Sequence, residues 1–124
     1  MSENLDNKGL SSIASNYDIF YIDLWGVIHN GITLHQNAIK ALEEIAKVRK
    51  QYVLLTNAPR PNTTVKSFLE KMGMNKEIRE NVYSSGEAAL SYIKKNLLND
   101  KIYQLISFFL YNSMQLHQMS TLFL

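Results

Sequence analysis

One acidic side chain interrupts a long apolar run near the beginning of the 124-residue chain. Residues 20–28 read FYIDLWGVI, so Asp23 is their only charged residue, and Gly26 follows it three positions later. A buried carboxylate is costly unless it is paired, hydrogen-bonded or bound to a cation. The pattern therefore places Asp23 at the carboxyl end of a buried strand, the edge at which open α/β sheets bind their ligands.

A second group of polar residues follows another apolar run. Residues 52–55 read YVLL, and Thr56 and Asn57 come directly after them, before a segment with two prolines. Carboxyl ends of neighbouring parallel strands meet at one edge of a sheet. We therefore expect Asp23 and Thr56 to lie at the same edge.

The elements that would position these side chains alternate between strand and helix. The apolar runs lack alternation, which is typical of parallel strands buried on both faces. Strand–helix alternation predicts an α/β fold, a partial doubly wound parallel sheet with right-handed connections. Strands are expected at residues 19–25, 52–55 and 82–83, and helices at residues 9–16, 37–49, 62–72 and from residue 84 onward.

Cap residues mark the ends of these helices. Asn37 and Asn62 are expected to cap two helix starts, and Gly73 is expected to end the second of these helices. Ser84 with Glu87 fits a capping box at the start of the last helix. The inward face of this last helix should carry Ala88, Ala89, Tyr92 and Ile93.

Composition excludes several classes of function. The chain has no cysteine, which rules out disulfides and thiolate metal sites and is compatible with a cytoplasmic location. The net charge is only +2 and the basic residues are dispersed, so nucleic acid is not an expected partner. The polar first residues do not resemble a signal peptide. No run approaches the ~20 apolar residues that span a bilayer, so a membrane association is not expected either.

Three segments together resemble a known family. They are DLWGVIHNG at residues 23–31, LLTNAPRP at residues 54–61 and SSGEAA at residues 84–89. In this order, the first two on strand ends with a helix between them, they are similar to the haloacid dehalogenase (HAD) superfamily and most similar to its class IIA phosphatases. The resemblance covers residues 9–104. It divides the chain into a leader with a short helix (1–16), the amino-terminal half of a HAD-like core (17–104) and a divergent apolar tail (105–124).

The resemblance implies magnesium-dependent hydrolysis of phosphate monoesters. Asp23 would attack phosphorus and form an aspartyl-phosphate. Mg2+ would bind the Asp23 carboxylate and the backbone carbonyl of Trp25. The Thr56 hydroxyl and the Asn57 amide would hold a phosphate oxygen of the substrate, a phosphorylated small molecule.

The chain departs from the family pattern in three ways. Trp25 occupies the position of the usual second aspartate, which is the general acid and base, and an indole cannot give up and take back a proton at neutral pH. The lysine and the acidic metal pair of the later motifs do not occur in the sequence. The resemblance fades after Gln104, where an apolar run begins. This tail is interpreted as sequence read past a break, such as a frameshift.

Two interpretations therefore remain open. In the first, the chain is half of a phosphatase. It is expected to be inactive alone, because a second chain must supply the missing lysine and carboxylates. In the second, it is a truncated remnant without turnover. Either way, the first strand should present an open apolar edge, which favours association. A small response-regulator-like module is a third, less favoured interpretation.

His29 and Arg60 are expected to have loop or surface roles.

Overall fold

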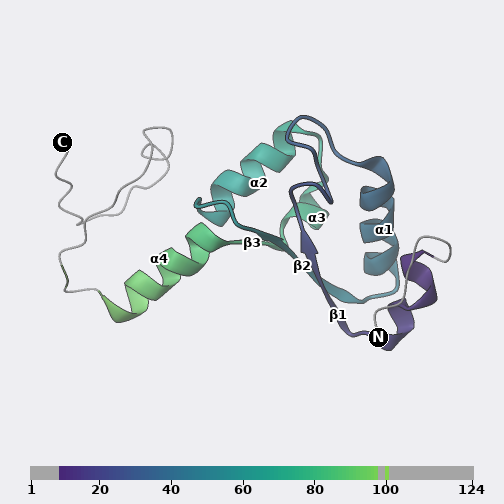
Figure 1. Cartoon of the computed structure of the whole chain (residues 1–124), viewed down its shortest axis with the longest axis horizontal. Helices are drawn as coiled ribbons and strands as arrows, with labels where there is room; N and C mark the ends of the chain where they lie inside the picture. The colour runs from purple at the N-terminus through teal and green to yellow at the C-terminus, as the bar shows by residue number, and fades with distance from the viewer. Residues whose placement is uncertain (1–8, 98–99, 101–124) are drawn as a thin grey trace.

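The computed structural model describes residues 9–97 and residue 100 (Figure 1). Residues 1–8 of the predicted leader and the predicted tail at 105–124 lie outside the described residues. Two short 3-10 helices, η1 (Leu10–Ser12) and η2 (Ala14–Asn16), precede the first strand. The remaining elements follow in the order β1 (Ile19–Asp23), α1 (Gln36–Lys47), β2 (Gln51–Thr56), α2 (Asn62–Lys71), α3 (Lys76–Arg79), β3 (Val82–Ser84) and α4 (Ser85–Asn96).

The three strands form one parallel sheet in the order β1-β2-β3. Phe20 lies beside Tyr52, and Leu54 lies beside Val82. The predicted α/β fold with alternating strands and helices is thereby confirmed, and the strands follow the predicted runs within two residues at each end. The single turn of α3 was not predicted, because four residues are too few to show a helical period.

One face of the sheet carries the core. Leu54 of β2 is fully buried, and it packs in one cluster with residues of α1 and α2, among them Leu42 and Leu69. The two connections between strands, from β1 to β2 and from β2 to β3, advance in the same direction across the sheet. Right-handed connections of this kind place their helices on the same face. The two long helices that connect the strands therefore cover one side only.

The opposite face of the sheet is exposed within the described residues. Tyr21 of β1 is 68% exposed, and Leu55 and Tyr83 on the neighbouring strands are also exposed. The prediction that the first strand is buried on both faces is therefore wrong for this part of the chain. β1 also forms an outer strand of the sheet, as the predicted open edge requires.

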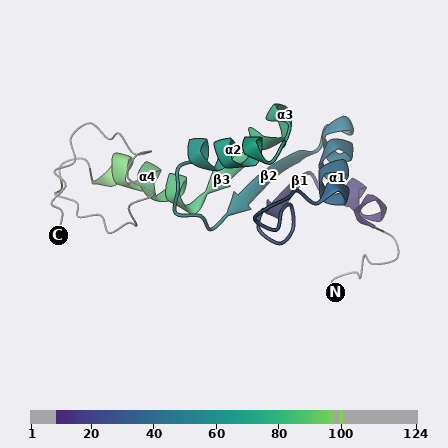
Figure 2. The same ribbon diagram turned by 90° about the horizontal axis from the view of Figure 1, so that it is seen from above.

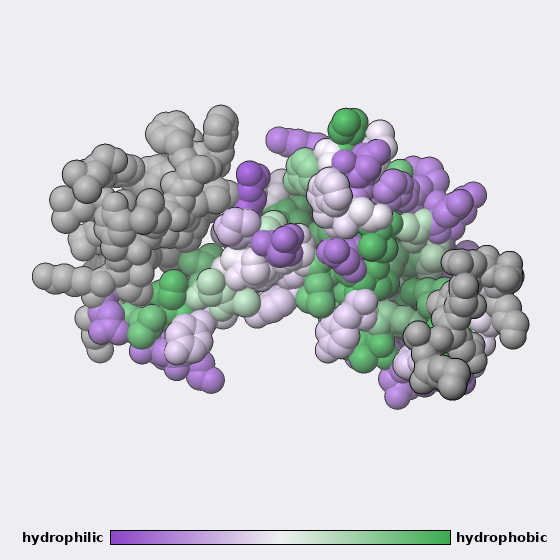
Figure 3. Space-filling model, viewed as in Figure 1, coloured by the Kyte–Doolittle hydropathy of each residue, from purple (hydrophilic) through white to green (hydrophobic). Residues whose placement is uncertain are grey.

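Helix α4 extends away from the body formed by the other elements (Figures 1 and 2). It has no buried residue, and Tyr92 is 62% exposed. The prediction that its apolar residues face inward is therefore wrong, because the described residues provide no surface against which the helix could pack. Its surface alternates between apolar and polar patches (Figure 3). No helix within residues 9–97 is long and apolar enough to cross a membrane.

The helix ends agree only in part with the predicted caps. Gly73 adopts a φ of 87° two residues after the last residue of α2, as predicted, and its amide donates to the carbonyl of Glu70. Asn37 does not cap α1, which begins one residue earlier, after His35. Asn62 does not cap α2 either: Pro61 occupies that position, and the Asn62 side chain accepts a hydrogen bond from the amide of Ser84 instead.

Candidate active site

Asp23 is the last residue of β1, and its carboxylate is fixed by the next amide. The Leu24 amide donates to Asp23 Oδ1 over 2.8 Å and also reaches the Leu55 carbonyl of β2 over 3.1 Å. Leu24 is only 1% exposed, whereas Asp23 and Trp25 on either side of it are exposed. The buried leucine therefore anchors the strand end while the carboxylate is presented to solvent.

The loop after β1 is a compact turn that closes on itself. Gly26 adopts a φ of 82°, which strains other residues, and its amide donates to the carbonyl of His29 over 2.7 Å. The amides of Ile28 and His29 both donate to the Leu24 carbonyl. The Trp25 carbonyl, in contrast, accepts no hydrogen bond from the described residues. This oxygen is therefore not engaged by the described part of the chain.

His29 is a buried residue of this loop that sequence reasoning missed. The prediction was a loop or surface role: His29 does lie in the loop, but it is not on the surface, because the residue is only 5% exposed and its ring packs edge-on against Phe68, with ring centres 5.7 Å apart. Burial lowers the pKa of His29, the neighbouring His35 lowers it further, and Asp23 opposes both effects. The Nδ1 of the ring accepts the Gly31 amide over 3.0 Å, which requires this nitrogen to be unprotonated. A lone histidine has no sequence signal for such a role.

Thr56 ends β2 and lies at the same edge of the sheet as Asp23, which pairs with Leu55 in the register. The Thr56 hydroxyl oxygen accepts the Ala58 amide over 3.2 Å. Because a hydroxyl can accept and donate at once, its proton remains available for a ligand. Asn57, the next residue, is exposed.

The segment after β2, residues 57–61, is held by the start of α4. The Ser85 hydroxyl lies 2.9 Å from the Asn57 carbonyl and 3.0 Å from the Ala58 carbonyl, and the Gly86 amide donates to the Ala58 carbonyl over 3.2 Å. The Ser84 hydroxyl donates to the carbonyl of Arg60. The two polypeptide segments therefore lie in direct backbone contact.

The predicted capping box at Ser84 is only half formed. The Ser84 hydroxyl accepts the Glu87 amide over 3.1 Å, as predicted. The Glu87 carboxylate, however, accepts the Asn62 amide over 2.9 Å, and Asn62 Oδ1 accepts the Ser84 amide over 2.9 Å. The Glu87 side chain thus accepts from the start of α2 instead of from its own helix start, and the Asn62 side chain of α2 accepts from the residue that caps α4. This exchange joins the first turns of α2 and α4 and could not be seen in a local sequence pattern.

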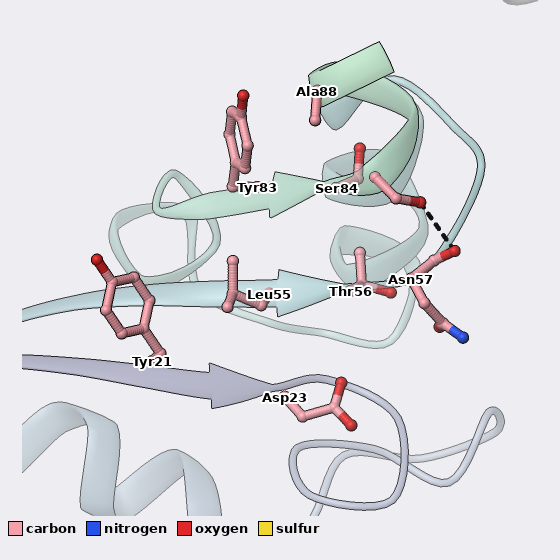
Figure 4. Close-up of a pocket in the computed structure, with 9 residues that line it drawn as sticks. Tyr21, Asp23, Leu55, Thr56, Asn57, Tyr83, Ser84 and Ala88 are labelled. Atoms are coloured by element: carbon pink, nitrogen blue, oxygen red, sulfur yellow. Dashed lines mark hydrogen bonds between the residues drawn. The ribbon is translucent and has the colours of Figure 1, made fainter.

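An open hollow of about 500 Å³ lies over the carboxyl ends of the strands (Figure 4). Asp23, Thr56 and Asn57 line it, so the structure brings these three predicted site residues together. Tyr21 and Tyr83 rise from the exposed sheet face at its other side (Figure 4). Trp25 does not line the hollow; it lies in the loop beyond Asp23, with its side chain 65% exposed.

The residues present fit a magnesium ion in part. Mg2+ binds through one or two carboxylates and otherwise keeps water and phosphate oxygens as ligands. The exposed Asp23 carboxylate is one such ligand, and the Trp25 carbonyl, which accepts no hydrogen bond from the described residues, is a second oxygen near it in the chain. Within residues 9–97, no three His, Asp or Glu side chains gather into a metal site. The described residues could therefore hold Mg2+ only together with water, substrate or further protein ligands.

The fold matches solved structures of larger proteins. A hydrolase of the haloacid dehalogenase-like family from Brucella suis 1330 is 29% identical, with a TM-score of 0.67 over 76% of this chain and 34% of that chain. A hypothetical protein from Pyrococcus horikoshii OT3 has 23% identity and a TM-score of 0.62, over 80% of this chain and 38% of that one. A 4-nitrophenylphosphatase from Thermotoga maritima has 20% identity and a TM-score of 0.57, over 68% and 33%.

The chain thus spans about a third of the length of these structures, the shares being 34%, 38% and 33%. No curated protein matches the chain. A family model described as haloacid dehalogenase-like hydrolase matches residues 20–115, which include the strand end at Asp23 and the strand end at Thr56. The resemblance inferred from the motifs is confirmed by this match, and the chain belongs to the haloacid dehalogenase-like hydrolase family.

Proposed function

We propose that the chain carries the phosphoryl-accepting part of a magnesium-dependent phosphatase, with Asp23 as the nucleophile. One observation carries the proposal: Asp23 and Thr56 end neighbouring parallel strands and line a common hollow. The name of the similar Thermotoga maritima protein, 4-nitrophenylphosphatase, supports phosphate monoesters as substrates. Family membership is consistent with this chemistry.

The reaction follows from the properties of these side chains. A carboxylate oxygen of Asp23 attacks phosphorus, the bond between phosphorus and the ester oxygen breaks, and the ester oxygen leaves with the bonding electron pair as an alkoxide or phenolate. Water then attacks the aspartyl-phosphate, which releases phosphate and restores the carboxylate. The Thr56 hydroxyl and the Asn57 amide donate to a phosphate oxygen throughout. Bound Mg2+ would neutralise part of the phosphoryl charge.

Because residue 25 is a tryptophan, the proposal is best tested on substrates whose leaving group needs no proton. Trp25 has no proton to give to a leaving group near neutral pH. An alkoxide would therefore leave slowly, whereas p-nitrophenolate is stable enough to leave unprotonated. A substrate with such an aryl leaving group separates phosphoryl transfer to Asp23 from the question of which group supplies the proton.

We further propose that a second polypeptide completes the core. All-parallel sheets are normally covered on both faces. In the described residues one face exposes Tyr21, Leu55 and Tyr83, and β1 forms an open edge. A partner that covers this face would also be placed to provide the lysine and the carboxylates that the family resemblance implies. We propose a cytoplasmic location for this assembly, with which the absence of cysteine is compatible.

The test is the turnover of p-nitrophenyl phosphate by the purified full chain. Release of p-nitrophenolate should require Mg2+ and should stop when a chelator is added, because the charge of the phosphoryl group is then no longer neutralised. An equal rate with chelator and with Mg2+ would contradict the proposal. Absence of release from a folded chain would favour the alternative, an inactive remnant.

A further inference from the structure

Trp25 is the largest exposed side chain beside the proposed nucleophile. The residue between them, Leu24, is 1% exposed, whereas the Trp25 side chain is 65% exposed. Its indole lies along the Asn30-Gly31 turn: a Cβ on Gly31 would lie 3.6 Å from Trp25 Nε1. The ring therefore lies against the backbone of its own loop and still offers most of its surface to solvent.

The turn beneath the indole is well ordered by hydrogen bonds. Asn30 Oδ1 accepts the amides of Ile32 and Thr33, at 2.9 and 2.8 Å, and the Gly31 amide donates to His29 Nδ1. Gly31 has a φ of 92°, a backbone conformation that favours glycine and that shapes the turn beside the ring. The indole is thus supported at a defined place before any ligand arrives, which reduces the entropy cost of packing against one.

Two other aromatic side chains near the site line the hollow itself, together with Asp23, from the face of the sheet. Tyr21 and Tyr83 stand on the exposed face of the parallel sheet (Figure 4). Sheets of this kind are normally covered by a second layer of protein on that face. Trp25 lies in a loop beyond the carboxyl end of β1, outside the sheet, where α/β proteins bind their ligands.

We propose that the Trp25 indole packs against the leaving group of the substrate, so that the site prefers aryl phosphates to alkyl phosphates. The inference rests on the proposed function, because it assumes that a phosphoryl group lies at Asp23. Packing of two aromatic rings contributes beyond the burial of area alone. We expect the phenyl ligand to bind about five- to tenfold more tightly than a methyl ligand with the same phosphoryl head.

Calorimetric titration of the full chain with phenylphosphonate and methylphosphonate in Mg2+ tests this preference. Both probes carry a carbon–phosphorus bond, so neither is hydrolysed during the measurement. The readout is the ratio of the two dissociation constants, because any change in the affinity for the common phosphonate head cancels in it. The ratio should fall close to one in a Trp25→Ala chain and stay near the wild-type value in Trp25→Phe, which restores an aromatic ring.

A matched control is an exposed aromatic residue away from the site. Tyr92 of α4 is 62% exposed and does not line the hollow, so Tyr92→Ala should keep the wild-type ratio. A ratio that falls in Tyr83→Ala but not in Trp25→Ala would overturn the inference, because the ligand would then pack on the sheet face.

Two further outcomes distinguish the inference from the proposed function. If both probes bind with equal affinity to the wild-type chain, the role of Trp25 is refuted while the phosphate site stands. If neither probe nor inorganic phosphate binds to the folded chain, the proposed function fails, and the inference fails with it.

Discussion

An Asp23→Asn chain is expected to release p-nitrophenolate only at the background rate, which in the core completed by the second polypeptide is a loss on the order of 10³-fold or more. The carboxamide is not a nucleophile toward phosphorus, and it removes the negative charge that would attract Mg2+. The substitution should leave the strand end intact, because the asparagine Oδ1 can still accept the Leu24 amide that Asp23 now accepts over 2.8 Å. The two side chains are also nearly identical in shape.

This prediction needs a parallel measurement of folding. Asp23 is exposed and forms no ion pair among the described residues. The free energy of unfolding, measured with urea by circular dichroism, should therefore change by no more than about 0.5 kcal/mol. Wild-type turnover in the Asp23→Asn chain would show that another residue, or a contaminating enzyme, is responsible for the activity.

The second large effect is expected from Gly86→Ala, which should lower the free energy of unfolding by about 3 kcal/mol. An added Cβ would lie 2.3 Å from the backbone nitrogen of Arg60, 2.5 Å from its carbonyl oxygen and 2.6 Å from its carbonyl carbon. These are backbone atoms, so no side chain can move aside. The segment 57–61 would have to shift and lose the hydrogen bond from Gly86 to Ala58.

The sign of the change in unfolding free energy distinguishes a clash between the added Cβ and Arg60 from the ordinary helix propensity of alanine. Gly86 lies in the first turn of α4, and in open space alanine would favour the helix by up to about 1 kcal/mol. The matched control is Gly73→Ala: Gly73 has a φ of 87° and no atom within 4 Å of an added Cβ, so this change should cost only about 1–2 kcal/mol. A Gly86→Ala chain as stable as the wild type, or more stable, would contradict the observed contact.

The order of the elements could be predicted because it depends on local patterns. Apolar runs that end in Asp23 and in Thr56 predict strands, and the physical rule that parallel strands share one carboxyl edge then places both side chains together. The structure has this arrangement, with both residues lining one hollow. Gly73 was predictable for a similar reason, because a glycine after a helical run has a local conformational cause.

Features that depend on contacts between distant segments could not be predicted. An apolar strand looks the same whether one face or both are covered, so the exposure of Tyr21 had no sequence signal. Asn62 was expected to cap its own helix, but the neighbouring strand offers the Ser84 amide, and the side chain accepts this bond instead. The burial of His29 against Phe68 likewise joins residues that are far apart in the sequence.

The central claim is that Asp23 accepts a phosphoryl group, and one measurement tests it most directly. The full chain is incubated with acetyl phosphate and Mg2+, quenched in acid, digested and mapped by mass spectrometry. We predict one added phosphoryl group on the peptide that contains Asp23, removed by hydroxylamine as expected for an acyl phosphate and absent from the Asp23→Asn chain. A folded wild-type chain that carries no phosphoryl group, or carries it on another residue, would contradict the claim.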